Sequence, residues 1–113
     1  MSEAEVQKTV ASYLDWHNYL WFHPVNEGKR SVQLSSMMKA QGMKAGVPDV
    51  CVLEPRNGYH GLFIELKVEG NKPTEKQLEW IKRLSERGYA TAVCWSADDA
   101  IKIIEGYMRG KRD

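Results

Sequence analysis

The spacing of apolar and polar residues predicts a helix and then an edge strand at the start of the chain. Over residues 3–20, apolar side chains such as Val6 and Val10 recur at helical spacing, with polar side chains on the opposite side. Residues 21–25 are aromatic and β-branched. Pro24 restricts them to the edge of a sheet, because proline has no backbone N–H to donate.

Two apolar runs in the middle of the chain, residues 47–53 and 62–68, are predicted to form neighbouring strands. The segment between them contains Pro55 and an Asn-Gly pair, which is typical of a hairpin turn, so we expect antiparallel strands. Residues 26–46 precede them as a polar, basic segment with at most a weak helix over 34–40. Loops of that length in compact domains tend to be functional.

Capping signals divide the second half of the chain. Thr74 with Gln77 forms a capping box that opens a helix, and Gly88 is the expected C-terminal stop of that helix. Residues 89–95 are predicted to form a strand, and Ser96 is expected to cap a last helix. The apolar stripe of the first of these helices is predicted to consist of Leu78, Ile81 and Leu84.

These elements predict a single α/β domain over residues 1–113. The order is helix, strand, strand, strand, helix, strand, helix, with a central mixed sheet flanked by helices. A right-handed crossover through the second helix should place strand 89–95 parallel to strand 62–68.

Composition excludes several classes of protein. Hydrophobic residues make up 42% and charged residues 27%, as in ordinary globular domains, so disordered and fibrous chains are excluded. No apolar stretch approaches the roughly 18 residues of a membrane span, and residues 1–5 lack the features of a signal peptide. Cys51 and Cys94 lie in apolar runs and are interpreted as core thiols. We therefore expect a cytoplasmic protein.

The charge is distributed unevenly although the net charge is only +1. Residues 28–48 carry four basic side chains and no acidic one. These basic residues are Lys29, Arg30, Lys39 and Lys44. A neutral chain with a local basic segment can bind a polyanion on one side.

Polar side chains interrupt the two central apolar runs at Asp49, Glu65 and Lys67. Alternation along a strand places Glu65 and Lys67 on one face, about 7 Å apart. A hairpin centred near Asn57 would put Asp49 opposite Glu65, whereas a two-residue Asn-Gly turn would put it opposite Leu66. Convergence of the two carboxylates therefore requires an odd-length loop or a bulge.

Two converging carboxylates beside a lysine favour a site for Mg²⁺ or Mn²⁺, which prefer oxygen ligands. The backbone carbonyl of Leu66 lies between the polar side chains and is a candidate ligand. A metal ion there would lower the pKa of a bound water and neutralise charge on a phosphate. Lys67 could orient or deprotonate that water, or donate to the phosphate.

Other residues have two interpretations each. Glu3 is either a third acid on the inward face of the first helix or an acid placed there by the helix dipole. Gln77 either only caps its helix or also faces the site. Taken alone, Glu-x-Lys is most often a surface ion pair, and Gly-x-Pro-Asp is most often a turn. The three histidines are interpreted as structural or surface residues, and the four tryptophans as core residues rather than platforms for stacking bases.

In combination, these motifs resemble a known family. Gly46-Val47-Pro48-Asp49, Gly61-Leu62-Phe63-Ile64-Glu65-Leu66-Lys67 and the later Gln77 are similar to the motifs of the PD-(D/E)XK nuclease superfamily. More narrowly, the chain resembles the VRR-NUC domain, the virus-type replication-repair nuclease. The resemblance extends from the Glu-x-x-Val-Gln segment at residues 3–7 to the final helix and includes the basic loop.

The resemblance implies a restriction-endonuclease-like core and a Mg²⁺- or Mn²⁺-dependent DNA endonuclease. Standalone members, often from phages or prophages, are homodimers that act on branched DNA such as four-way junctions. The implied metal ligands are Asp49, Glu65, the Leu66 carbonyl and Glu3, with Lys67 assisting the water and Gln77 in support. The implied DNA contacts are Asn26, Lys29, Arg30 and Lys44. A phage-encoded protein would act in the cytoplasm of its bacterial host.

Three other functions remain open from the sequence. The first is a DNA-binding accessory module that keeps this fold without cleaving, although two carboxylates near phosphates would then lack a metal to offset their charge. The second is an RNA-directed enzyme with the same core. The third is a small structural domain in which Glu65 and Lys67 form only a surface ion pair.

Overall fold

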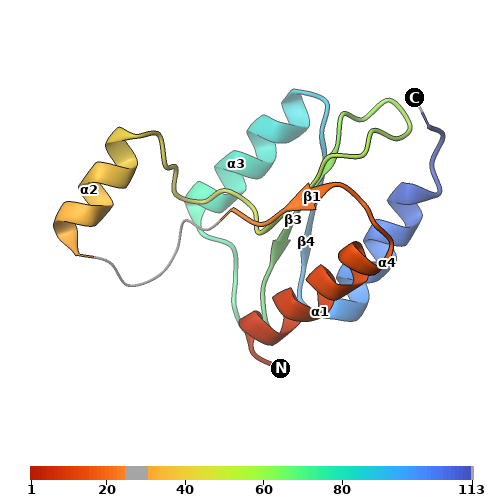
Figure 1. Cartoon of the computed structure of the whole chain (residues 1–113), viewed down its shortest axis with the longest axis horizontal. Coiled ribbons are helices and arrows are strands. Elements are labelled where there is room, and N and C mark those ends of the chain that lie inside the picture. Colours follow the sequence, from red (N-terminus) through yellow and green to blue (C-terminus); the bar gives the residue numbers. More distant parts are fainter. Residues whose placement is uncertain (25–30, 113) are drawn as a thin grey trace.

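The computed structural model describes residues 1–24 and 31–112. Its helices and strands occur in the predicted order, with one short helix added in the basic segment (Figure 1). In chain order they are α1 (Glu3–Trp16), β1 (Trp21–Phe22), α2 (Val32–Ala40), β2 (Val50–Val52), β3 (Leu62–Leu66), α3 (Glu75–Glu86), β4 (Ala90–Cys94) and α4 (Ala97–Met108).

The strands form one four-stranded mixed sheet in the order β1-β2-β3-β4. β2 and β3 pair antiparallel and β4 pairs parallel to β3, as the sequence predicted, and β1 pairs antiparallel with β2. β1 lies at the edge and is shorter than expected, because it ends at Phe22, before Pro24. β2 begins at Val50, after Pro48, which cannot donate to a neighbouring strand.

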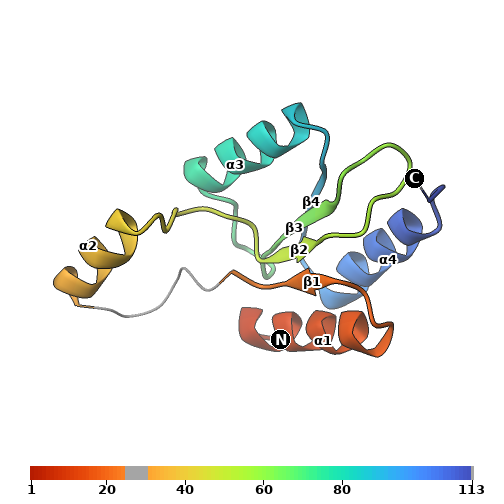
Figure 2. The same ribbon diagram turned by 45° about the horizontal axis from the view of Figure 1, so that its top comes forward.

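Helices cover both faces of the sheet. α1 and α4 lie together on one face, and α3 lies on the other (Figure 2). The main core is the layer between the sheet and the α1–α4 pair. Its buried apolar side chains come from α1 (Val6, Val10, Leu14), from β2 and β3 (Val50, Val52, Leu62, Ile64, Leu66), and from β4 and α4 (Cys94, Ala97, Ala100, Ile104).

The predicted caps are present. The Thr74 hydroxyl accepts from the Gln77 N–H at 3.2 Å, and the Gln77 side-chain oxygen accepts from the Thr74 N–H at 2.8 Å. The Ser96 hydroxyl accepts from the backbone N–H of Asp99 and so caps α4. Gly88 follows α3 with φ +90°, a conformation that favours glycine.

The predicted apolar stripe of α3 is wrong at Leu78, which is 51% exposed. The side chains that α3 buries are Gln77 and Leu84. The capping box explains the rotation: the hydrogen bonds of Gln77 to Thr74 hold its polar side chain inside the helix-sheet contact. One position of the inward face is therefore polar.

The prediction that the tryptophans are core residues is wrong for Trp16 and Trp95, and none of the four is fully buried, although Trp21 packs against the main core. Trp16 and Trp95 are exposed, and Trp21 and Trp80 are half-buried. Two of the indoles hold loops: Trp21 Nε1 donates to Asp15 Oδ1 at 2.7 Å, and Trp95 Nε1 donates to the Asn71 carbonyl at 2.8 Å. The indole N–H groups therefore explain part of the exposure, since they need polar partners.

α2 lies away from the sheet and buries none of its residues (Figures 1 and 2). Ser31 caps it through a hydrogen bond from the backbone N–H of Leu34, so the helix begins two residues before the predicted weak helix. No helix in the described part of the chain has the length and apolar character needed to cross a membrane.

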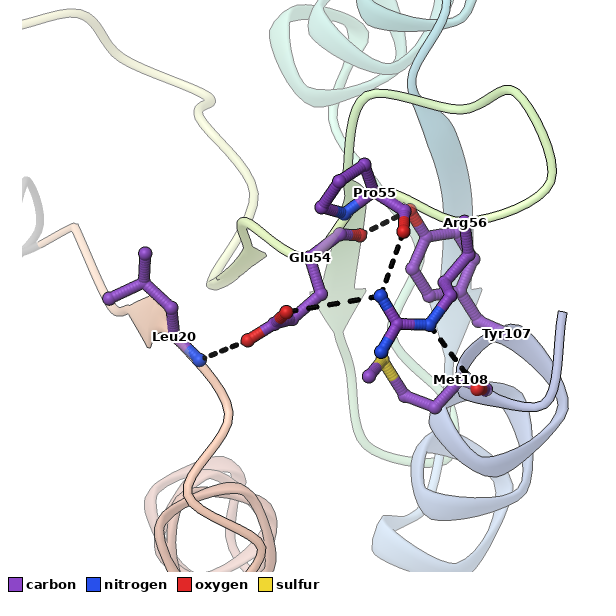
Figure 3. A network of polar contacts seen from close by, with 6 residues as sticks. All are labelled: Leu20, Glu54, Pro55, Arg56, Tyr107 and Met108. Atoms are coloured by element: carbon purple, nitrogen blue, oxygen red, sulfur yellow. Dashed lines mark hydrogen bonds and ion pairs between the residues drawn. The ribbon is translucent and has the colours of Figure 1, made fainter. Parts of the chain in front are cut away.

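The loop between β2 and β3 is fixed to the C-terminal helix by a buried arginine (Figure 3). Arg56 Nη1 donates to the Pro55 carbonyl at 2.8 Å and lies 3.9 Å from Glu54 Oε1, and its Nε donates to the Met108 carbonyl at 3.4 Å. The other carboxylate oxygen of Glu54 accepts from the backbone N–H of Leu20, at 2.9 Å. We call Glu54 and Arg56 with these partners the Arg56 network.

Candidate functional site

The register of the central hairpin places the two strand carboxylates side by side. Val50 pairs with Ile64, so Asp49, one residue earlier, is opposite Glu65, one residue later. Directly opposed residues of an antiparallel pair have their side chains on the same face of the sheet. The structure therefore brings together the two acids that the sequence singled out.

This register arises from an offset in the β2–β3 loop. Asn57 and Gly58 both have positive φ, 54° and 83°, and Arg56 pairs with Tyr59 across them, as in a two-residue turn. Between this turn and the strands, residues 53–55 on one arm face residues 60–61 on the other. The extra residue acts as the bulge that the chemistry required.

Asp49 is bound to the end of β3. Its Oδ2 accepts a hydrogen bond from the Leu66 N–H at 2.8 Å, in place of a backbone partner. The N–H and C=O of one strand residue point to the same side of the strand, so we infer that the Leu66 carbonyl also points toward Asp49. A carboxylate oxygen and a backbone carbonyl oxygen, both of which can be ligands of Mg²⁺, therefore lie at this end of the hairpin.

Glu65 and Lys67 are a buried pair. The Lys67 Nζ lies 3.6 Å from Glu65 Oε2, and the exposed fractions of the two residues are 9% and 1%. The backbone N–H of Lys67 donates to the Cys94 carbonyl at 2.9 Å, which continues the parallel pairing beyond β3. The pair is thus no surface ion pair, and the structural-domain hypothesis loses the observation on which it depended.

Gly46 explains how the chain reaches Asp49. Its φ is +86°, and an added Cβ would lie 2.8 Å from the carbonyl carbon of Lys76 and 3.0 Å from the backbone nitrogen of Gln77. Any side chain at this position would push the loop away from the first turn of α3. The loop before Asp49 and the buried end of Gln77 are therefore held against each other by a close backbone contact.

Glu3 does not form a ready-made metal site with Asp49 and Glu65 in the described part of the chain. It is half-buried in the first turn of α1. Among the described residues, no three side chains of Asp, Glu, His or Cys form a group that could hold a metal ion. The role of Glu3 as a ligand remains a prediction.

His23 is a residue near the site that sequence reasoning did not assign to it. Its Nδ1 lies 2.6 Å from the carbonyl oxygen of Asp49, so Nδ1 carries the proton and donates to this carbonyl. His23 is exposed, which agrees with the expected surface position. No motif could have indicated the contact, because it depends on the pairing of β1 with β2.

The thiol beside the site is inert. Cys51 is fully buried, and burial raises the pKa of its thiol to about 12, with the Asp49 carboxylate adding to the rise. Burial likewise raises the pKa of the Cys94 thiol to about 11. Both thiols are therefore neutral core residues at physiological pH, as the sequence predicted, and neither is a nucleophile.

The predicted DNA contacts are described only in part. Asn26, Lys29 and Arg30 lie outside the described residues. Lys44 is exposed and lines a hollow against the outer face of α3. It lies in the loop that reaches the site through Gly46.

Comparisons with known proteins agree with the fold. A solved structure described as a VRR_NUC domain protein is similar over 100% of this chain and 93% of its own, with 30% sequence identity and a TM-score of 0.85. Another, described as a VRR_NUC domain, is 26% identical over 95% of this chain and 99% of its own, with a TM-score of 0.64. No match was found among curated proteins.

The family model for the VRR-NUC domain matches residues 1–98, a region that includes both carboxylates, Lys67 and the whole of α3. The match and the similar structures bear out the resemblance seen in the sequence motifs. This chain belongs to the VRR-NUC domain family and is a nuclease-type domain.

Proposed function

We propose that this protein is a Mg²⁺- or Mn²⁺-dependent DNA endonuclease that selects branched DNA, such as four-way junctions. The observation that carries the proposal is the hairpin register, which sets Asp49 opposite Glu65 with Lys67 3.6 Å from Glu65. The family resemblance supports branched DNA as the substrate and phage or prophage DNA replication, recombination or repair as the setting.

The donor chemistry fits a hard divalent cation. Asp49, Glu65 and the Leu66 carbonyl offer only oxygen atoms, and Glu3 is the proposed helix-borne acid. When bound, the ion would supply Lewis acidity and an activated water. A pair of carboxylates next to phosphates would otherwise repel the substrate, so a cation gives these buried acids a chemical purpose.

The chain's own residues would hold and orient the reacting groups. Lys67 is proposed to donate to the attacked phosphate or to orient the water, since its Nζ is held beside Glu65. Gln77 supports the site from α3, where its capping hydrogen bonds fix its side chain. Because Asp49 accepts from the Leu66 N–H, the acid cannot rotate away without breaking that bond.

A cleavage assay tests the proposal. Labelled four-way junction, flap, duplex and single-stranded DNA, and single-stranded RNA, are incubated with Mg²⁺, Mn²⁺ or EDTA. We expect metal-dependent cutting of branched DNA by the wild type and by Glu69→Gln, a matched control whose exposed carboxylate follows the site. Glu65→Gln should not cut.

Other outcomes overturn the proposal in distinguishable ways. Tight DNA binding without cutting in any metal would favour the non-cleaving accessory module. Cleavage of single-stranded RNA but not of DNA would favour an RNA-directed enzyme. Metal binding is measured separately by titrating Mn²⁺ into wild type and Asp49→Asn in a calorimeter, and equal binding would remove Asp49 from the ligand set.

We also propose that the active form is a homodimer, because a two-fold pair can present two sites to a symmetric junction. Sedimentation in the analytical ultracentrifuge tests this, with and without junction DNA. A monomer in both conditions would contradict it.

A further inference from the structure

A hollow of about 600 Å³ lies between the loop that carries Lys44 and the outer face of α3. This volume falls in the range of roughly 300–1,000 Å³ that is usual for small-ligand sites. The residues that line it and matter here are Lys44, Lys76, Trp80, Arg83, Leu84 and Arg87. We call this hollow the α3 groove.

The groove follows a single stripe of the helix. Lys76, Trp80 and Arg83 are spaced by four and three residues, and Arg87 comes four residues later, so all four lie on one side of α3. At 1.5 Å of rise per residue, the stripe is roughly 16 Å long. It therefore presents a line of cations with an aromatic ring among them.

The positive charges in the groove are not neutralised by acidic side chains of its lining. Its lining has four cationic side chains and no acidic one. Among the described residues, no ion pair includes Lys76, Arg83 or Arg87, although Arg87 Nη1 donates to the Arg83 carbonyl at 3.0 Å. The acids Glu75 and Glu79 line a smaller hollow that shares Lys76 and Trp80 with the groove, so negative charge borders the groove there. The groove therefore fits a polyanion that lies along its cationic side chains and stays away from Glu75 and Glu79.

Trp80 distinguishes between forms of nucleic acid. It is half-buried, and unlike the indoles of Trp21 and Trp95 it has no hydrogen bond to another described residue. An aromatic ring binds nucleic acid by stacking on the face of a base, and in a duplex the neighbouring base pairs cover that face, so stacking on Trp80 requires an unpaired base. Leu84, buried behind the stripe, gives the groove an apolar floor.

The groove adjoins the catalytic residues. The Gly46 contact holds the loop from Lys44 to Asp49 against the first turn of α3. That turn places Gln77 toward the sheet and Lys76 in the groove. A strand that leaves the catalytic carboxylates past Gly46 therefore meets the groove next.

We propose that the α3 groove binds an unpaired strand of the DNA substrate, with a base stacked on Trp80 and the neighbouring phosphates on Lys44, Lys76 and Arg83. This inference rests on the proposed function and refines it: among branched DNAs, those with single-stranded nucleotides adjoining the cut site, such as a flap, are preferred over a four-way junction whose arms are fully paired. A DNA with an unpaired arm meets this requirement better than a fully paired duplex.

The test measures DNA binding in EDTA, where no cleavage occurs. The fluorescence anisotropy of a labelled oligo-dT and of a duplex of equal length is recorded with each variant. We expect Trp80→Ala to weaken oligo-dT binding about ten-fold, and Trp80→Phe to restore most of it, since stacking contributes roughly one factor of ten per base. Duplex binding should change less than about two-fold.

Matched controls separate the groove from general charge. Arg83→Gln should weaken oligo-dT binding and reduce its salt slope by about one. Lys82→Gln on the same helix and Trp16→Ala on α1, both exposed and outside the groove, should bind like the wild type. Wild-type affinity of Trp80→Ala and Arg83→Gln, or equal losses on oligo-dT and duplex, would overturn the inference.

The outcome is distinguishable from a failure of the proposed nuclease. If Glu65→Gln and the wild type both fail to cut, yet oligo-dT binding depends on Trp80, the groove stands and the catalysis does not. If the wild type cuts in a metal-dependent manner and the groove variants bind oligo-dT normally, the nuclease stands and the groove does not.

Discussion

Two Glu-x-cation pairs, each with a buried cation, lie at opposite ends of the β2–β3 hairpin. Glu54 and Arg56 belong to the loop, with 3.9 Å between carboxylate oxygen and guanidinium nitrogen, and Glu65 and Lys67 lie at the end of β3, with 3.6 Å. Arg56 and Lys67 are equally buried, at 9% exposure each. Sequence pattern, separation and burial of the cation do not distinguish the two pairs, although the Glu54 side chain is 21% exposed and that of Glu65 only 2%.

Their partners do. Through its hydrogen bonds, the Arg56 network connects the residue before β1, the β2–β3 loop and the end of α4 (Figure 3). Tyr107 adds a bond from its hydroxyl to the Glu54 carbonyl at 2.7 Å. Glu65 and Lys67 pair within one strand and lie next to Asp49. A buried charge that links separate segments stabilises the fold, whereas one that gathers further acids without linking segments indicates chemistry.

The largest expected effect is on cleavage. Asp49→Asn and Glu65→Gln should each reduce the cleavage rate at least about 10³-fold, because a metal site supplies several kcal/mol of stabilisation to the transition state. Single-turnover rates on junction DNA in Mg²⁺ measure this. Thermal unfolding in EDTA should show that both variants still fold, with a lower melting temperature for Glu65→Gln, because that change leaves the buried Lys67 without its ion-pair partner. Asp98→Asn, an exposed acid on α4, is the control.

The next effect is on stability. Arg56→Met should lower the free energy of unfolding by about 3 kcal/mol, since it removes one partner of a buried ion pair and leaves two carbonyls without their donor. Arg109→Met breaks an exposed pair of equal length, 3.9 Å to Glu105, and should cost less than about 0.5 kcal/mol. Urea unfolding of both variants provides the comparison. Equal losses in the free energy of unfolding would mean that the Arg56–Glu54 and Arg109–Glu105 pairs contribute equally to stability.

A smaller loss is expected for Lys67→Ala. Its rate at saturating metal should fall about 10²-fold, the usual contribution of a positioned proton donor or base. Lys72→Ala, an exposed lysine a few residues later, should keep the wild-type rate. A wild-type rate for Lys67→Ala would show that this lysine is only a structural partner of Glu65. The Glu65–Lys67 pair would then have the same kind of role as the Arg56 network.

The smallest effect belongs to Tyr107→Phe. This change removes only the hydroxyl that donates to the Glu54 carbonyl, so it should cost about 1 kcal/mol of stability. Cleavage per folded molecule should not change. The same urea titration measures the stability, and a loss of activity without a loss of stability would show that the far end of the hairpin acts on the site.

The sequence predicted most of the fold because its signals are local. The Thr74–Gln77 box, the Ser96 cap and Gly88 determine helix ends through contacts within a few residues. Trp16, Trp95 and Leu78 were misjudged because their positions depend on which faces meet in three dimensions. In α3 the polar Gln77 occupies an inward position and Leu78 faces outward. The type of side chain alone does not reveal this.

The candidate site shows the same division. Asp49, Glu65 and Lys67 could be identified because they interrupt apolar runs, but two registers remained open. Both descriptions of the turn are partly right: the Asn-Gly turn exists, and the strands behind it follow the other register. The contact of His23 with Asp49 could not be predicted, because it joins β1 to the strand beside it in space.

The offset in the β2–β3 loop has a consequence for insertions and deletions. Surface loops normally tolerate changes in length, but side chains alternate along a strand. Removing one residue from 53–55 would therefore turn Asp49 to the other face of the sheet while every residue of the site remained in the chain. Adding two residues would preserve the arrangement. The loop at the other end of the hairpin thus decides, by the parity of its length, whether the two acids lie on the same face.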